Sequence, residues 1–247
     1  MGRTYNHPPI TEALCEFSFV PGQLWDLTIP GLMYEKVGKE FPDRKQKIGL
    51  GFRVVSTEKG FEQKVEPAPP HMQFHKADKT ALIQVAPDLL VYNQLKPYPT
   101  WNIFKPSILK ILETYKEVAN PKEFKQIELR YINKIEIDDK NFKISDYFDF
   151  YPHIPHGINR NPSSYISRVE IPFADNRDLL LIVLGNTPDE GTDLKIIMLD
   201  IHYIMNVSGA LPVGKIDEWM ETAHSTIEES FESCIKEKSR ELFGEVR

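Results

Sequence analysis

The chain has 247 residues, of which 41% are hydrophobic and 27% are charged, and its formal net charge is −6. Such a composition is ordinary for a soluble globular protein with a sizeable core, and the acidic balance argues against a nucleic-acid-binding surface over the whole molecule. No apolar run approaches the ~18 residues of a membrane span and no signal peptide is recognisable, so we expect a cytoplasmic protein without a membrane partner.

The first half of the chain reads as a strand, a helix, several strands and a long helix. The alternating pattern of residues 13–20 predicts the first strand, and Pro30 falls in the first turn of a helix that Pro42 ends. After them we expect a strand at 47–57, a proline-rich surface connection at 62–71 and a hairpin of residues 72–77 and 80–86. A strand at 89–94 follows, after a bulge or edge kink at Pro87-Asp88. A helix then starts near Trp101, with Pro106 in its first turn.

The strand predicted at Ile127–Ile137, with the sequence IELRYINKIEI, organises the rest of the chain. Its odd positions are apolar except for Asn133, and its even positions are charged except for Ile132. This alternation is typical of a strand with one buried face and one face in contact with water or a partner. A buried amide needs hydrogen-bond partners, so Asn133 is predicted to pin the register or to mark a bulge.

The second half repeats the order of elements in the first. We expect a short helix at 144–150, strands at 165–173, 179–184 and 195–205, and a final helix from about 216 to 242. Trp101 and Trp219 both open a long helix, and Ala13 and Leu129 both begin an alternating strand. The two halves show negligible sequence identity, so the repeat is inferred from the order of elements alone, and an α+β domain with coincidental symmetry is the alternative.

We therefore predict an α+β fold made of two β-α-βββ-α pseudo-repeats, residues 1–120 and 121–247, packed as one globular unit. Strands joined by short hairpins are antiparallel, and apolar helix faces need a sheet to cover. The expected structure is a curved antiparallel sheet with the long helices on one face, similar in element order to saddle folds or to the helix-grip folds of small-ligand carriers. No function follows from that likeness.

The sequence shows no recognisable catalytic, cofactor or metal site, so we expect no enzyme. Cys15 and Cys234 belong to no metal or redox motif and are predicted to be core residues. The region of Gly49-Leu50-Gly51 lacks a third glycine and the strand-to-helix setting of a phosphate loop. His153 and His156 lie three apart in a loop, but no third zinc ligand is indicated.

The charged face of the predicted sheet is the candidate site. Its charges have both signs and are mixed with aliphatic side chains, which suits a protein partner better than a nucleic acid. A solvated face with cross-strand ion pairs is the alternative, and Asp200 with His202 is either a paired carboxylate and imidazole or ordinary surface. The candidate partner-binding residues are Arg130, Ile132, Lys134, Arg168, Glu170, Asp200 and His202.

Two short motifs resemble a known family. They are the N-terminal run YNHPPITEALCEF, residues 5–17, and the central run LRYINKI, residues 129–135. They are similar to the P-I-x-E-A and L-R-Y-x-N-x-I segments of a sporadically distributed, uncharacterised prokaryotic family, which has no established catalytic residues to carry over. In size and organisation the chain also resembles the small accessory protein encoded beside the single-polypeptide type III-E CRISPR effector and its caspase-like protease.

That resemblance implies a non-catalytic partner of another protein, such as the protease substrate or the sigma factor encoded at the same locus. Our leading hypothesis is accordingly a protein-interaction module in a prokaryotic defence or regulatory assembly, without cofactor or metal. The alternative is a carrier or sensor of a small apolar ligand held in a cavity between sheet and helices. An enzyme acting on nucleic acid or protein is disfavoured by the missing motifs.

Overall fold

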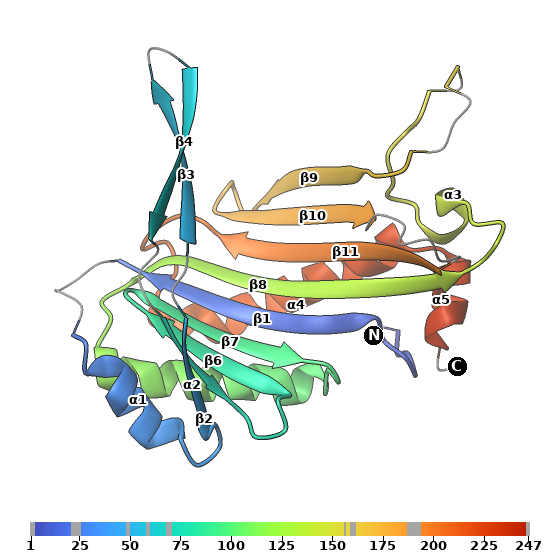
Figure 1. The fold of residues 1–247 in the computed structure, drawn as a ribbon. Coiled ribbons are helices and arrows are strands. Elements are labelled where there is room, and N and C mark those ends of the chain that lie inside the picture. Colours follow the sequence, from blue (N-terminus) through green and yellow to red (C-terminus); the bar gives the residue numbers. More distant parts are fainter. Residues whose placement is uncertain are drawn as a thin grey trace.

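The computed structural model describes residues 3–20, 26–47, 50–57, 60–67, 71–155, 157–158, 162–186 and 194–245, with only the backbone described for 50–57, 60–67 and 213. A nine-stranded antiparallel sheet forms its centre, in the order β2-β5-β6-β7-β1-β8-β11-β10-β9 (Figure 1). Its strands are β1 (Ile10–Phe19), β2 (Asp43–Lys47), β5 (His71–His75), β6 (Ala81–Ala86), β7 (Leu89–Leu95), β8 (Phe124–Asp138), β9 (Ile166–Phe173), β10 (Asp178–Asn186) and β11 (Leu194–Met205). Strands β3 (Leu50–Thr57) and β4 (Gly60–Pro67) form a separate antiparallel pair. The predicted α+β class and antiparallel sheet are confirmed.

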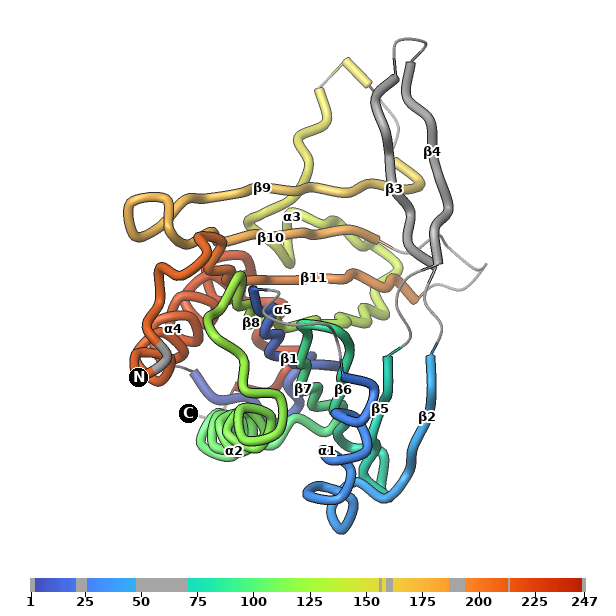
Figure 2. Tube along the Cα trace, turned by 90° about the vertical axis from the view of Figure 1, so that its left-hand side faces the viewer, coloured from blue at the N-terminus to red at the C-terminus, as the bar shows by residue number. Residues whose placement is uncertain are grey.

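The longer helices lie on one face of the sheet, as Figure 2 shows. They are α1 (Ile29–Val37), α2 (Trp101–Ala119) and α4 (Ile216–Cys234). The short helices α3 (Ile144–Tyr147) and α5 (Glu237–Phe243) pack against each other, and a 3-10 turn (Val213–Lys215) leads into α4. In the part of the chain that is described, no helix combines the length and the hydrophobicity needed to cross a lipid bilayer.

The hydrophobic core lies between the sheet and these helices. Strand residues at alternate positions and the apolar stripes of α2 and α4 are buried there, because each helix presents one face to the sheet. The Phe19 and Tyr115 rings stack with centroids 5.1 Å apart, and the Tyr203 and Trp219 rings lie 5.8 Å apart. Cys15 and Cys234 are buried in this core as free thiols, as predicted.

Strand β8 fulfils the prediction made for Ile127–Ile137 and is longer at its start. Asn133 is 2% exposed, and its Nδ2 donates a hydrogen bond to the backbone oxygen of Leu199 on β11 at 3.0 Å. The pairing of β1 with β8 shifts between Ile10 and Glu12, next to Asn133. The buried amide therefore ties β8 to β11 at the bulge between β1 and β8, and both expected roles are confirmed.

The segment between α1 and β5 differs from its prediction. The single strand expected at 47–57 is wrong, because β2 ends at Lys47 in the main sheet and β3 belongs to the other pair. The surface connection expected at 62–71 is also wrong, since β4 pairs with β3 along its whole length. The β4 sequence GFEQKVEP has only two large apolar residues, four positions apart, so it gives no period-2 signal of a buried face.

Two proline predictions are corrected. Pro87-Asp88 is neither a bulge nor an edge kink but the two-residue turn of the hairpin between β6 and β7, with Asp88 at φ +54°. Pro106 is the sixth residue of α2 and lies beyond the first turn. A proline there removes a hydrogen bond near the helix start, where the remaining turns and the buried face still hold the helix.

The final helix is broken where one helix was expected. It ends at Cys234, and α5 begins at Glu237. Between them Ile235 forms an isolated antiparallel bridge with Phe148, and Lys236 N–H donates to the Tyr147 oxygen at 2.8 Å. Backbone hydrogen bonds to the end of α3 thus replace those of a continuous helix, and the apolar spacing of the sequence does not reveal this exchange.

Candidate functional site

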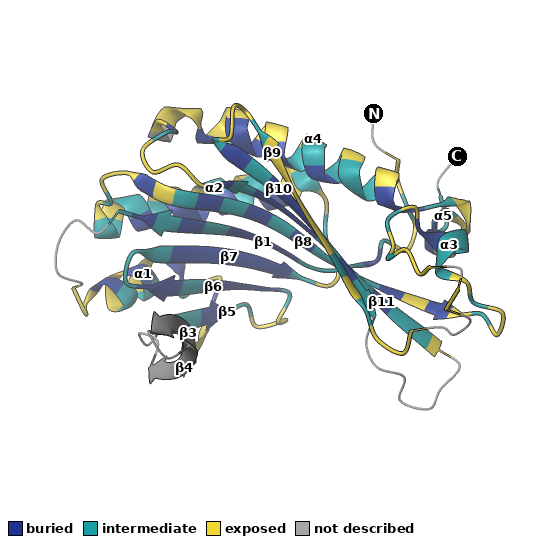
Figure 3. Ribbon diagram, turned by 90° about the horizontal axis from the view of Figure 1, so that it is seen from above, coloured by how far each residue is buried: buried dark blue, intermediate teal, exposed yellow. Residues whose placement is uncertain are grey.

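We call the face of the nine-stranded sheet opposite α1, α2 and α4 the open face. The described helices leave it uncovered, and buried and less buried residues alternate along several strands of the sheet in Figure 3. Leu14, Leu82, Val91 and Leu181 lie on this face and are all less than 10% exposed. The open face therefore contains buried apolar side chains and is not uniformly exposed to solvent.

Four charged residues form a network at the middle of the open face. Arg130 on β8 makes two hydrogen bonds to Asp200 on β11, Nε to Oδ1 at 3.0 Å and Nη2 to Oδ2 at 2.7 Å. The network continues at His202, whose Nε2 lies 3.1 Å from Asp200 Oδ1 and whose Nδ1 lies 2.6 Å from Glu128 Oε1. Since His202 pairs with Arg130 in the β8–β11 register, these contacts follow from the alignment of two strands.

The network determines the charge state of its members. Burial opposes the charge on His202, but hydrogen bonds to Asp200 and Glu128 outweigh it and raise the pKa of the imidazole. Burial likewise opposes the charge on Asp200, whereas His202 and Arg130 hold the pKa of that carboxyl below its ordinary value. His202 is therefore favoured as an imidazolium that donates both N–H groups to carboxylates.

Glu16 adds an uncompensated carboxylate to this network. It lies directly opposite Glu128 in the pairing of β1 with β8. Burial and the charge of Glu128 raise its pKa, while a hydrogen bond from Ser18 and the charge of Arg130 only partly oppose this. With Glu12 from the same strand, the centre of the open face holds four carboxyl groups against two cationic side chains, and its charge is net negative.

A row of amide side chains crosses the other half of the open face. Gln73 Nε2 donates to Gln84 Oε1 at 2.9 Å, and Gln84 Nε2 donates to Asn93 Oδ1 at 2.9 Å. Asn93 Nδ2 donates in turn to Glu12 Oε1 at 2.6 Å. The chain of donors runs from β5 through β6 and β7 to β1, so a second ordered polar array ends beside the charged network.

The predicted partner-binding residues are only partly brought together. Arg130, Asp200 and His202 form the network, and Ile132 pairs with Asp200 and is half-buried. Lys134 lies further along β8 in an ion pair with Glu136 at 2.6 Å. Arg168 and Glu170 are bonded to each other on β9, two strands beyond β11. Glu16 and the amide row were not predicted, because strand order and register decide which side chains of β1, β5, β6 and β7 meet.

The structure gives little indication of a reactive side chain at His202, Cys15 or Cys234. Both ring nitrogens of His202 are engaged with carboxylates, so neither is free to take a proton from a substrate. Burial raises the pKa of Cys234 to about 12 and raises that of Cys15 as well, which opposes thiolate formation. No three His, Cys, Asp or Glu side chains of the described residues gather as metal ligands, and His156 lies outside those residues.

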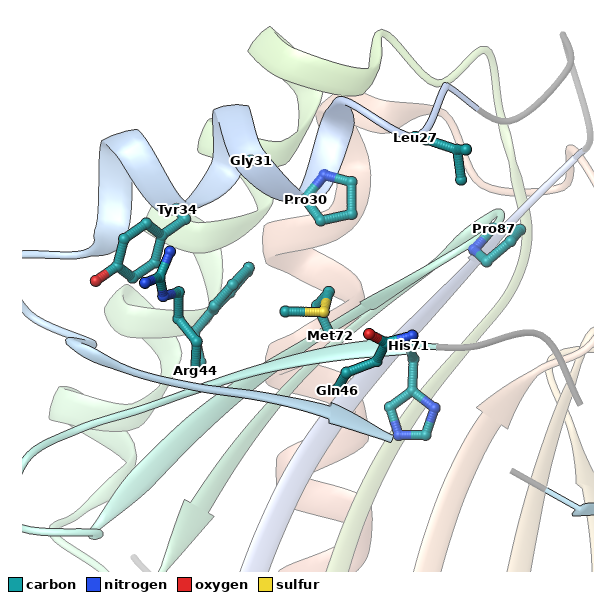
Figure 4. Close-up of a pocket in the computed structure, with 10 residues that line it drawn as sticks. Leu27, Pro30, Gly31, Tyr34, Arg44, Gln46, His71, Met72 and Pro87 are labelled. Carbon is teal, nitrogen blue, oxygen red and sulfur yellow. The ribbon is translucent and has the colours of Figure 1, made fainter. Parts of the chain in front are cut away.

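A cavity lies at the other end of the sheet, between α1 and strands β2 and β5 (Figure 4). Its volume is about 370 Å³. Most of its lining is apolar, and Arg44, Gln46 and His71 supply polar groups at the strand side. A Cβ atom added at Gly31 would meet no atom within 4 Å, so the cavity extends to the α1 backbone. The lining residues are Leu27, Pro30, Gly31, Tyr34, Arg44, Gln46, His71, Met72, Phe74 and Pro87.

The two motifs that suggested a family lie side by side. Residues 10–19 form β1 and residues 124–138 form β8, and the two strands pair along the middle of the sheet. No protein-family model and no curated protein matches the chain. The family resemblance therefore stays a prediction that depends on these two paired segments.

Proposed function

We propose that this chain is a protein-binding module that uses the open face of its sheet, and that its partner contributes a Lys or Arg side chain to Glu16. The observation that carries the proposal is the direct pairing of Glu16 with Glu128 in a net negative, partly buried surface. A cation of the partner placed there relieves the repulsion between the two carboxylates. The same negative charge repels phosphate groups, which disfavours a nucleic acid.

The order of the surface supports recognition. The polar side chains around Glu16 are held by neighbours: His202 by two carboxylates, Asp200 by Arg130, and Asn93 by Glu12 and Gln84. Groups that are already fixed lose little side-chain entropy when a partner binds. Buried aliphatic residues such as Leu14 and Leu181 lie between the polar ones, which gives the mixed character of a protein interface.

The resemblance supplies the cellular setting of the proposal. It suggests a non-catalytic accessory protein of a prokaryotic, CRISPR-associated defence or regulatory assembly in the cytoplasm. Its partner would be the protease substrate or the sigma factor encoded at the same locus. Neither a cofactor nor a metal is part of this role.

We also propose that the fold is doubled, with halves 1–120 and 121–247 as pseudo-repeats in one saddle-like sheet. The order β5-β6-β7-β1 in one half mirrors β9-β10-β11-β8 in the other, about the seam between β1 and β8. Glu12 accepts a hydrogen bond from Asn93 on β7, and Glu128 contacts His202 on β11, each at 2.6 Å. These two contacts occupy corresponding places, so the two polar arrays of the open face are the two versions of one feature.

The test uses affinity purification of the tagged chain from its native host, with quantitative mass spectrometry of captured proteins. We expect a stoichiometric partner whose capture is lost in Glu16→Lys and retained in Glu229→Lys. Glu229 is an exposed residue of α4, away from the open face, so it controls for the change in net charge. Equal capture by both variants, or a partner cross-linked only to the helices, would refute the use of the open face.

The cavity beside α1 favours a second function, a carrier or sensor of a small apolar ligand. About 370 Å³ is in the range of known small-molecule sites. Native mass spectrometry of the purified chain should then show a bound organic molecule that Gly31→Trp excludes, because the new side chain fills the cavity. Leu32→Trp changes an exposed residue of the same helix and should leave the ligand bound. A chain free of ligand before any substitution argues against this function.

A further inference from the structure

The two halves of the sheet end differently, because only the first half has an additional edge strand. In the first half the outer edge of β5 is covered by β2. Strand β9, at the corresponding place of the second half, pairs only with β10 among the described strands and forms the edge of the sheet (Figure 1). The place that β2 takes beside β5 is thus open beside β9.

The free edge of β9 presents regularly spaced backbone groups. The Arg177 oxygen accepts a hydrogen bond from Asn206 N–H, so the backbone of this residue points toward β11. Backbone direction alternates along an antiparallel strand, so Asp178, Leu180 and Ile182 face β9. Their partners on β9 use their N–H and C=O groups toward β10, while Ile166, Arg168, Glu170 and Pro172 direct theirs outward. Pro172 has no N–H to lose at this edge, which agrees with its position.

The side chains of β9 are unusually apolar for an edge. Val169 and Ile171 lie on the side of the helices but are 37% and 41% exposed. Arg168 and Glu170, bonded to each other, lie on the opposite side. By contrast, every described residue of β2 is exposed and its sequence is DRKQK, a charged edge of the kind that discourages pairing.

We propose that β9 is an interface between two copies of this chain, in which β9 pairs antiparallel with the partner copy's β9 about a two-fold axis at Val169. The two sheets then form one continuous sheet. Arg168 of each copy lies opposite Glu170 of the other, with two pairs of backbone hydrogen bonds between them. The Val169 side chains meet at the axis, and Ile171 of each copy packs beside them.

Charge selects this register over its neighbours. Residues of β9 whose backbone groups point outward must pair with such residues of the other copy. Neighbouring registers therefore differ by two residues, which moves the two-fold axis by one residue. A shift of the axis to residue 168 places two arginines opposite each other, and a shift to residue 170 places two glutamates opposite each other. Like charges at directly opposed positions are destabilising, whereas the Val169 axis pairs each cation with an anion. Because the contact is confined to one edge, we expect a weak, concentration-dependent dimer.

Sedimentation equilibrium of the full chain, compared with variants, tests the interface. Arg168→Glu should raise the dimer dissociation constant about tenfold or more, because two attractive pairs become repulsive ones. The double variant Arg168→Glu with Glu170→Arg restores opposite charges and should recover the dimer. Lys134→Glu alters a similar ion pair, also two residues apart, on interior strand β8 and should leave the dimer unchanged. A wild-type chain that remains monomeric up to millimolar concentration, or no recovery in a folded double variant, would overturn the proposal.

A cross-link tests the register directly. The α-carbons of opposed non-hydrogen-bonded residues lie about 4.5 Å apart, within reach of a disulfide. Val169→Cys should therefore form a covalent dimer with oxidised glutathione as the oxidant, since both native cysteines are buried. Ile171→Cys places its two thiols roughly four residues, about 13 Å, apart along the strands and should remain uncross-linked. Equal cross-linking of both variants would exclude the Val169 axis.

Discussion

The two faces of the central sheet differ in what lies against them. On the helix side Trp219 is 3% exposed and lies against Tyr203 of the sheet. On the open face Leu181 and His202 are 6% and 9% exposed, although the described helices leave that face uncovered. The first face is desolvated by a layer of helices, whereas the buried side chains of the second face lie outside that layer.

This difference separates stability from recognition. Burial of apolar surface between layers contributes roughly in proportion to its area and is the main source of folding free energy. A hydrogen bond or ion pair on the open face replaces one with water and contributes only ~0.5–1.5 kcal/mol, or somewhat more when a charge is involved. Substitutions on the helix side should therefore change stability most, and those on the open face should change the surface offered to a partner.

The largest effect is expected for Trp219→Ala. The substitution leaves a cavity between α4 and β11, so we expect the free energy of unfolding to fall by ~3–5 kcal/mol. Thermal and urea denaturation, followed by circular dichroism, measure it. The indole Nε1 has no hydrogen-bond partner among the described residues, so Trp219→Phe should cost much less. Equal losses in the two variants would show that packing against the sheet is not what holds α4.

A smaller loss is expected for Asp200→Ala on the open face. The carboxylate accepts two hydrogen bonds from Arg130 and one contact from His202, and its removal leaves both cations short of a partner. We expect a loss of ~1.5–3 kcal/mol in urea denaturation. A double-mutant cycle with Arg130→Ala checks it, since the two losses should add to more than the loss in the double variant. Strict additivity would mean that the network does not exist in solution.

The fold was largely predictable because burial on one face leaves a regular trace. Period-2 alternation at Ile127–Ile137 and three-to-four spacing around Trp219 located β8 and α4, since each has one face in the core. Strand β4 left no such trace and was mistaken for a connection. The break at Ile235 was invisible for another reason, because it depends on a bridge to Phe148, which is 87 residues earlier in the chain.

The candidate site was predictable in composition but not in contacts. Alternation placed Arg130, Asp200 and His202 on one face, and they do lie together. Which residues touch depends on register and strand order, which are set by pairings between distant segments. Glu16 illustrates the limit: its interest comes from lying opposite Glu128, and only the pairing of β1 with β8 reveals it. For the same reason, the sequence did not show that Arg168 and Glu170 lie two strands away from Asp200 and His202.

The pH dependence of stability should reveal the charged network. The folded-state pKa of His202 is raised above its ordinary value of 6.5, so its stabilising contribution is complete below pH 6.5 and is lost as pH rises through the folded pKa. We expect stability to fall as the pH rises above 6.5, and this fall to disappear in His202→Gln. Burial lowers the pKa of His75 and lowers that of His224 to about 4. These two groups therefore reduce stability as the pH falls below 6.5, which is the opposite pH dependence. An unchanged profile in His202→Gln would contradict the assignment.

The smallest effect, of opposite sign, is expected for Glu16→Gln. Burial and the Glu128 charge raise the folded-state pKa of Glu16, so the ionised carboxylate costs stability once pH exceeds its ordinary pKa of 4.5 and rises through the folded value. The amide removes that cost, and we expect a gain of about 0.5 kcal/mol at pH 7 and none near pH 4. The same variant should bind the partner less well, because it lacks the charge that attracts a Lys or Arg. A residue that lowers the stability of the fold and contributes to binding is expected in a binding surface. A gain in stability with undiminished capture would exclude Glu16 from partner binding and would direct attention to the cavity beside α1.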